Sequence, residues 1–386
     1  MRQSSHSGTG RLLPLDGLRG IAALLVFFEH FARLFHPLSS ASFTSVNWID
    51  IPFVALTNGA SAVALFFVLS GYVLTHTVLA APERSIARAV LTRLPRLVPL
   101  VLTSMLLAWL LIRLQWVPVL STAALTHSSW VNDIRRDAEL QWPTLRLSEV
   151  LLQGVVFTFF RGDFMRSVNP SLWTLHLELV GSFLVYGLAS VVRKSKPQEA
   201  RLVFGFTALL CIFSAPYLCL FVIGASLAHY HQTATQSDLN TASNPKFKLP
   251  VGGLAVLVAM LVLAFHNPVW GIRYAGLPLR QSDSAAGIAI NGAMASLMIH
   301  ASLQKGSLRR LLTIPMLTRL GSLSFAFYVL HFPILISVGA TVLLALNPLY
   351  GFDLALAAAL IATMGVTLLL STILTHFDQS WRRHLN

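Results

Sequence analysis

The stretch LDGLRGIAALLVFFEHFARLF, residues 15–35, decides the fold. It is mostly apolar and about as long as the roughly 20 residues that a helix needs to cross the hydrocarbon core of a membrane. It nevertheless contains Arg19 and His30. Ionisable side chains inside a span are costly and usually face a cavity or a partner. The stretch therefore predicts a membrane-spanning helix that carries functional side chains, and not a plain lipid anchor.

Helix geometry relates the two ionisable residues to each other. Arg19 and His30 are eleven positions apart, which puts them within about 20° of one helix face and about 16 Å apart along the axis. Arg19 is expected at the cytoplasmic boundary, where Asp16 one turn earlier could hold its guanidinium, and His30 in the outer half of the membrane. The alternatives are a basic anchor for Arg19 and a hydrogen-bonded core histidine for His30.

Composition supports a membrane protein throughout. Of the 386 residues, 55% are hydrophobic and only 11% are charged, whereas soluble domains carry about 25% charged residues. The net charge of +13 resides in short clusters between apolar runs, as in cytoplasmic membrane loops, so no nucleic-acid partner is expected. Cys211 and Cys219 lie in apolar stretches and form neither a disulfide framework nor a metal-binding pattern. No metal site is predicted.

The apolar runs predict an all-α, polytopic transmembrane bundle of about ten spans with both termini cytoplasmic. The run Val150–Phe160 is too short to cross and is read as an interfacial or re-entrant helix. We expect one membrane-embedded domain over residues 1–386, with a short cytoplasmic tail at 1–14 and no appended soluble domain. The predicted spans are Leu15–Phe35, Gly59–Ala80, Leu97–Trp116, Ser171–Val192, Leu202–Phe213, Tyr217–His231, Leu249–Phe265, Ala285–Leu303, Leu320–Leu344 and Leu354–His376.

Two further sets of ionisable residues stand out. Glu178 lies in its span at a depth similar to that of His30, so the two could form a base and an orienting carboxylate if their helices are neighbours. Arg93 and Arg96 lie at i and i+3 at the cytoplasmic start of the third span and could form, with Arg19, a basic mouth on the inner face. Arginine suits phosphate because its planar guanidinium binds two oxygens at once. Plain determination of topology by positive loops is the alternative.

Five ordered motifs cover nearly the whole chain. They are Leu15-Asp16-Gly17-Leu18-Arg19 running to His30, Phe66-Phe67-Val68-Leu69-Ser70-Gly71-Tyr72, the basic stretch with Arg93, Arg96 and Pro99, Ser171-Leu172-Trp173-Thr174-Leu175 with Glu178, and Ser324-Phe325-Ala326-Phe327-Tyr328 continuing to His331 and Pro333. In these residues the chain resembles the integral-membrane acyltransferase type 3 family. One departure is Glu29, which stands where an apolar or aromatic residue is commoner in that family.

The resemblance implies an acyltransferase that moves an acyl group, usually acetyl from acetyl-CoA, onto a sugar hydroxyl of a surface or exported glycan. For that activity we expect His30 to act as general base or acyl carrier, Glu178 to orient or charge a partner, and Arg93, Arg96 and Arg19 to bind the CoA phosphates. Supporting or tunnel-lining roles fall to Asp16, Ser70, Tyr72, Trp173, Tyr328 and His331. The expected partners are acyl-CoA, a glycan or glycoside acceptor and the lipid bilayer, with a bacterial inner membrane as the location.

Two other functions are compatible with intramembrane charges. A transporter of a lipid-linked sugar would also place ionisable groups near mid-membrane, usually with internal repeats or broken helices, and no repeat is found. A non-catalytic scaffold of a polysaccharide assembly complex would not need His30 and Glu178 inside the membrane. The sequence gives no indication of the acceptor sugar or of the oligomeric state.

Overall fold

The computed structural model describes residues 12–35, 55–81, 85–128, 130–132, 134, 142–161, 167–240 and 285–385. Within these ranges the chain is helical nearly throughout and has no strand, which confirms the all-α prediction. In chain order the elements are α1 (Leu13–Phe35), α3 (Gly59–Ala80), α4 (Ile86–Arg113), α5 (Val119–Thr126), η2 (Trp142–Thr144), α7 (Leu147–Leu152), η3 (Gln153–Arg161), η4 (Pro170–Trp173), α8 (Thr174–Val192), α9 (Pro197–Ser214), α10 (Pro216–Asn240), α12 (Ala285–Leu303), α13 (Ser307–Leu312), α14 (Pro315–Ile334), η5 (Leu335–Gly339), α15 (Ala340–Tyr350) and α16 (Phe352–Leu385).

Six helical stretches among the described residues are long and apolar enough to cross a membrane. They comprise α3, α4, η4 with α8, α12, α14 through α15, and α16. The chain is therefore an integral membrane protein. The total of about ten spans and the cytoplasmic placement of both termini stay predictions, and the predicted span Leu249–Phe265 lies outside the described residues.

The helix boundaries differ from the predicted spans most clearly in α4. We expected the span to begin at Leu97, but the helix begins at Ile86, where the Ser85 hydroxyl caps it by accepting a hydrogen bond from the Arg88 amide at 3.3 Å. Arg93 and Arg96 consequently lie well inside the helix. Elsewhere α3 has the predicted bounds, and the short run Val150–Phe160 falls in α7 and the π-helical η3.

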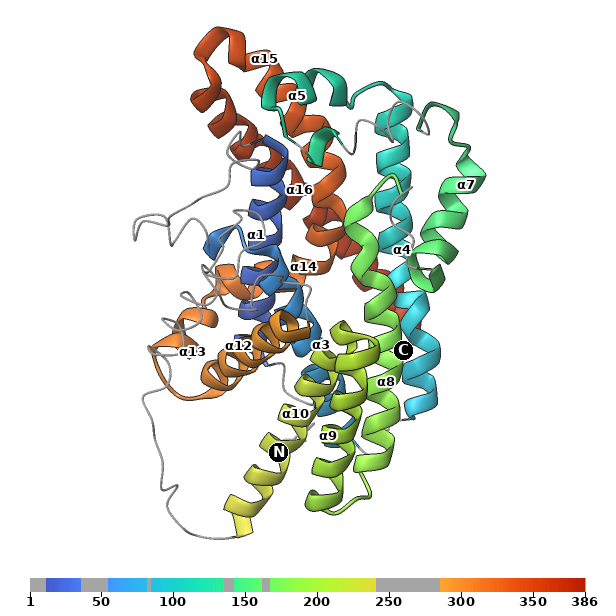
Figure 1. Ribbon diagram of the computed structural model, residues 1–386, viewed down its shortest axis with the longest axis vertical. Helices are drawn as coiled ribbons and strands as arrows, with labels where there is room; N and C mark the ends of the chain where they lie inside the picture. The colour runs from blue at the N-terminus through green and yellow to red at the C-terminus, as the bar shows by residue number, and fades with distance from the viewer. Residues whose placement is uncertain are drawn as a thin grey trace, which may run out of the picture.

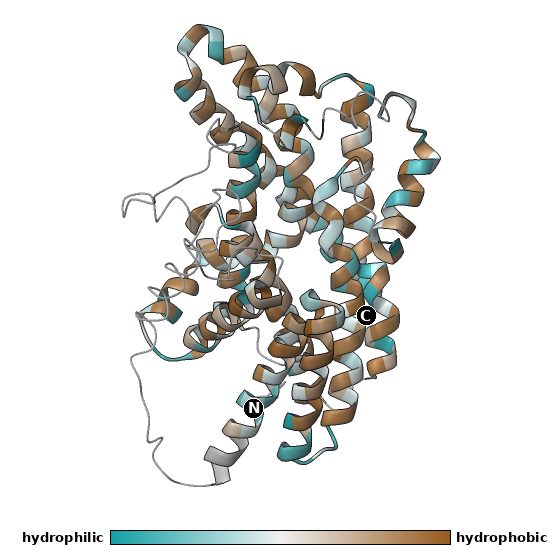
Figure 2. Ribbon diagram, viewed as in Figure 1, coloured by the Kyte–Doolittle hydropathy of each residue, from teal (hydrophilic) through white to brown (hydrophobic). Residues whose placement is uncertain are grey.

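The helices form an elongated bundle with the α15–α16 hairpin at one end and the α8–α9 junction at the other (Figure 1). Hydrophobic residues run along most of the helices, and hydrophilic residues gather at ends such as the α8–α9 junction (Figure 2). At the centre, α1 packs against α14 and α3 packs against α10. A Cβ atom at Gly71 would overlap the carbonyl oxygen of Phe221 in α10. The small residue thus permits the close helix crossing that membrane interfaces favour.

Two prolines inside helices free backbone carbonyls, because proline lacks the N–H that would bond four residues back. Pro333 frees the carbonyl of Val329 in α14, which accepts hydrogen bonds from the Ser104 hydroxyl at 2.5 Å and the Asn169 amide at 2.9 Å. Pro99 frees the carbonyl of Pro95 in α4, which accepts from the Trp381 indole at 3.0 Å. Side chains from distant elements thereby satisfy the carbonyls and join α4 to α14 and α16.

Candidate active site

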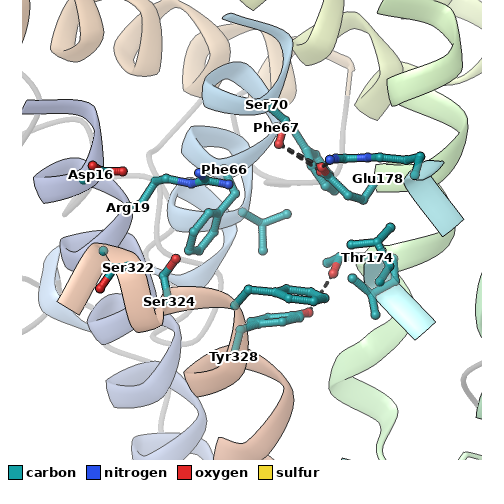
Figure 3. Close-up of a pocket in the computed structure, with 16 residues that line it drawn as sticks. Asp16, Arg19, Phe66, Phe67, Ser70, Thr174, Glu178, Ser322, Ser324 and Tyr328 are labelled. Atoms are coloured by element: carbon teal, nitrogen blue, oxygen red, sulfur yellow. Dashed lines mark hydrogen bonds and ion pairs between the residues drawn. The ribbon is translucent and has the colours of Figure 1, made fainter. Parts of the chain in front are cut away.

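A cavity of about 230 Å³ lies between α1, α3, α4, α8 and α14 (Figure 3). Its charged lining residues are Asp16, Arg19, Arg93 and Glu178. Its remaining walls combine aromatic rings with hydroxyl groups, contributed by Phe66, Phe67, Phe325, Ser70, Thr174, Ser322, Ser324 and Tyr328. The motifs quoted from the sequence therefore converge on one space, although they are spread over the whole chain. A cavity with apolar walls and a few polar groups is the usual form of a small-molecule site.

One wall of the cavity is organised by Glu178 in α8. Its carboxylate forms an ion pair with the Arg93 guanidinium of α4 and accepts hydrogen bonds from the Ser70 hydroxyl of α3 at 2.9 and 3.1 Å. Arg93 also donates to the Ser182 hydroxyl, one helical turn further along α8, at 2.9 Å. These contacts fix three helices to one another and compensate both charges inside the bundle.

The structure does not bring Glu178 to His30, so the expected base–carboxylate pair between them is wrong. The Nδ1 atom of His30 instead lies 2.6 Å from Nε2 of His331 in α14, and the two rings are nearly parallel with centroids 4.9 Å apart. The Nδ1 atom of His331 in turn lies 2.5 Å from the carbonyl oxygen of Tyr328. His331 is thus the direct neighbour of His30.

The carbonyl oxygen of Tyr328 determines which ring nitrogens carry protons. A carbonyl only accepts, so Nδ1 of His331 must donate to it, and a neutral His331 then presents a lone pair at Nε2. His30 must donate to that lone pair from its own Nδ1. A neutral His30 therefore has its basic lone pair at Nε2, which is the arrangement required of a general base.

The other side of the His30 ring faces a small group of aromatic and charged residues. Its Nε2 atom lies 3.3 Å from Oε2 of Glu29. The Trp130 ring packs against it with centroids 5.0 Å apart, and the Phe332 ring lies edge-on at 6.4 Å. His30 and His331 are both buried. The edge of the imidazole that carries the Nε2 lone pair is therefore enclosed by protein groups.

Tyr328 links the cavity to the histidine pair. Its ring lines the cavity, and its hydroxyl shares a 2.7 Å hydrogen bond with the Thr174 hydroxyl and donates to the carbonyl oxygen of Ser171. Its ring centroid is 5.7 Å from that of His331, one turn along α14. The cavity thus begins beside Arg19 and ends one helical turn from the histidines.

The other predicted residues divide into two groups. Asp16, Arg19, Arg93 and Ser70 line the cavity as expected of tunnel or donor-binding residues, whereas Arg96, Tyr72 and Trp173 are not among its lining residues. The Tyr72 hydroxyl lies 3.0 Å from Nδ1 of His231 in α10, and the Trp173 ring packs on Tyr217 with centroids 5.5 Å apart. Tyr72 and Trp173 therefore contribute to helix packing at these positions.

Asn169 and Ser104 were not predicted from the sequence. The Asn169 side chain is fully buried, donates to the Ser104 hydroxyl at 2.7 Å and to the Val329 carbonyl, and accepts from the Ser171 hydroxyl at 2.6 Å. Pro333 indicated that a carbonyl would be freed, but not which residue would bind it. Among the described residues no group of three or more histidine, cysteine or acidic side chains is arranged to hold a metal ion.

Comparison with known proteins identifies a family. A family model described as an acyltransferase domain matches residues 13–376, nearly the whole chain. No curated protein and no solved structure matches the chain. The match begins at the first residue of α1 and extends into α16, so it includes the cavity and the histidine pair.

Proposed function

Because the chain belongs to the integral-membrane acyltransferase type 3 family, whose domain model spans residues 13–376, we propose that it transfers acetyl from acetyl-CoA to a sugar hydroxyl. The acceptor in this proposal is a surface or exported glycan, and the enzyme acts in a bacterial inner membrane. The proposal rests above all on one observation: the cavity is lined from Arg19 to Tyr328, and the Tyr328 ring lies 5.7 Å from that of His331, which contacts His30.

The donor is proposed to enter from the end of the cavity beside Arg19. CoA carries phosphates on a nucleotide and a thioester on a flexible arm, so it needs basic groups at the entrance and an apolar passage beyond them. Arg19, Arg93 and Arg96 are the proposed phosphate ligands. Arg93 is also ion-paired to Glu178, and Arg19 lines the same cavity. The rings of Phe66 and Phe325 line the passage for the arm.

The reaction is proposed to occur at His30. Nε2 of His30 takes the proton of the acceptor hydroxyl as its oxygen attacks the thioester carbonyl, a carbon–oxygen bond forms, and the carbon–sulfur bond breaks. The CoA thiolate then receives the proton from His30, which leaves an ester, free CoA and a neutral histidine. His331 and the Tyr328 carbonyl hold the required tautomer. Transfer through an acetylated His30 would use the same lone pair.

The test is acetyl transfer by the purified protein in lipid vesicles, with labelled acetyl-CoA and a panel of glycan acceptors. We expect label in the glycan with the wild type and none with His30→Ala at equal protein level. Ser324→Phe, which adds a ring to the cavity wall, should raise the KM for acetyl-CoA at least tenfold while leaving the melting temperature close to that of the wild type.

Two outcomes would contradict the proposal. Transfer by His30→Ala at the wild-type rate would remove His30 from the reaction. Movement of a lipid-linked sugar across the vesicle membrane without any labelling would identify the protein as a transporter, the alternative function that intramembrane charges permit.

A further inference from the structure

Among the residues that the structure describes, Glu29 is an acidic residue in direct contact with His30. Its Oε2 atom lies 3.3 Å from Nε2 of His30, the nitrogen opposite the one that contacts His331. The Glu29 side chain is 7% exposed and its other oxygen, Oε1, lies 3.3 Å from Nη1 of Arg33. Adjacent residues on a helix point about 100° apart, so this contact depends on how the Glu29 side chain bends back toward the ring.

The Glu29 carboxylate lies against the start of α3. A Cβ atom at Gly59, the first residue of α3, would overlap Oε2 of Glu29. The carboxylate therefore occupies space that exists because this residue has no side chain. Arg33 holds the opposite oxygen from one turn further along α1. Glu29 is thus held between two elements with one oxygen directed at His30.

Hydrogen-bond chemistry decides when this contact is attractive. A neutral His30 has a lone pair at Nε2, because its Nδ1 proton is donated to His331. A carboxylate oxygen also only accepts. The two atoms therefore attract each other only after Nε2 has taken up a proton and the ring carries a positive charge. In acyl transfer that state arises when the base removes the proton of the acceptor hydroxyl.

We propose that Glu29 is a positioning residue that stabilises the protonated His30 formed during the reaction, an inference that rests on the proposed acetyltransferase function. The hydroxyl proton moves to Nε2 of His30, the Glu29 carboxylate balances the new charge, and the proton then leaves to the CoA thiolate. An interaction that is stronger in the transition state than in the ground state raises kcat without tightening substrate binding.

The other groups that contact His30 do not supply a negative charge. His331 presents a neutral lone pair, and Trp130 and Phe332 are aromatic. Arg33 is cationic, but its side chain is 39% exposed and lies over the Trp130 ring, with the guanidinium carbon 5.2 Å from the ring centroid. Solvent screens an exposed charge more strongly than a buried one, and Glu29 supplies the negative charge that lies in direct contact with Nε2.

The experiment compares Glu29→Gln, Glu29→Asp and Arg33→Gln with the wild type in the acetyl-transfer assay, with kcat and the KM for both substrates measured separately. Glu29→Gln keeps the shape but loses the charge, and we expect kcat to fall about 10- to 100-fold with each KM within about twofold. Glu29→Asp should recover part of the loss. Arg33→Gln removes the neighbouring ion pair alone and should lower kcat less than about threefold.

A second variant moves the carboxylate without removing it. Gly59→Ala adds a Cβ where Oε2 of Glu29 lies, and we expect a kcat loss of the same order as in Glu29→Gln. Activity of both variants at the wild-type level, an increase in kcat on removing the charge, or an equal loss in Arg33→Gln would each overturn the inference while leaving the proposed function intact. Absence of transfer by the wild type would instead overturn the proposed function, and this inference with it.

Discussion

The Nδ1 atom of His30 in α1 lies 2.6 Å from the Nε2 atom of His331 in α14, across 301 positions of the sequence. The contact joins the first and last of the five motifs and places the lone pair of His30 at Nε2. His331 acts as the hydrogen-bond acceptor for His30, because its own Nδ1 donates to the Tyr328 carbonyl. The two histidines and one backbone carbonyl act as a chain in which each proton position fixes the next.

Two replacements of His331 should show whether catalysis requires a hydrogen-bond acceptor at this position or the imidazole ring itself. His331→Gln can still accept the His30 Nδ1 proton through its amide oxygen, and we expect it to retain a substantial part of kcat. His331→Leu removes the acceptor, so His30 can adopt the other tautomer, and kcat should fall roughly 100-fold or more. Steady-state acetyl transfer at matched protein levels measures both. Equal activity of the two variants would contradict the tautomer chain.

The Arg93–Glu178 pair should behave as a coupled unit. Removing one partner leaves the other charge uncompensated inside the bundle, so we expect Arg93→Met or Glu178→Gln to cost about 3 kcal/mol each in the free energy of unfolding. The double variant should cost clearly less than the sum, with a coupling energy of about 1–3 kcal/mol.

Reversible unfolding in detergent supplies the four free energies of that cycle. Arg88→Met is the matched control, because Arg88 lies on the same helix and is exposed. Its replacement should change stability by no more than about 0.5 kcal/mol. Strictly additive effects of Arg93 and Glu178 would mean that the ion pair contributes nothing beyond its separate members.

The contribution of Asn169 to stability should depend on Pro333, because this proline frees the carbonyl that Asn169 binds. Asn169→Ala removes a buried donor to the Val329 carbonyl, and we expect a loss of about 2 kcal/mol in the free energy of unfolding. In the Pro333→Ala background, the restored amide at position 333 can bond to that carbonyl in the ordinary helical way. In that background, Asn169→Ala should lower the free energy of unfolding by markedly less than it does in the wild type. The same cost in both backgrounds would show that Asn169 acts through other contacts.

The crossing of α3 and α10 should tolerate no side chain at Gly71. A Cβ there overlaps the Phe221 carbonyl oxygen, so Gly71→Ala must push the helices apart, and we expect a loss of about 2 kcal/mol or more. Gly187 in α8 has nothing within 4 Å of its Cβ position. Gly187→Ala should therefore be neutral or stabilising by up to about 1 kcal/mol. Thermal unfolding of both variants in one detergent gives the comparison, and a destabilised Gly187→Ala with an intact Gly71→Ala would refute it.

Some features of the site could be read from the chain because they depend on local properties. The length of an apolar run decides whether a helix can span the membrane, and α3 has the predicted bounds for that reason. The helical repeat placed Arg19 and His30 on one face. The motifs identified the family, which the match over residues 13–376 confirms. The helix α4 begins before the predicted span, because its basic first turns continue the same helix although they are not apolar.

The sequence by itself therefore determined the helical membrane fold, the family and the set of polar residues that a membrane span would not carry without a reason. Only the tertiary structure decided their partners. Glu178 binds Arg93 and Ser70, His30 binds His331, and Glu29 approaches the other nitrogen of His30. The physical reason is that a helix fixes the direction of each side chain about its own axis, whereas the group that meets it depends on which distant helix packs against that face.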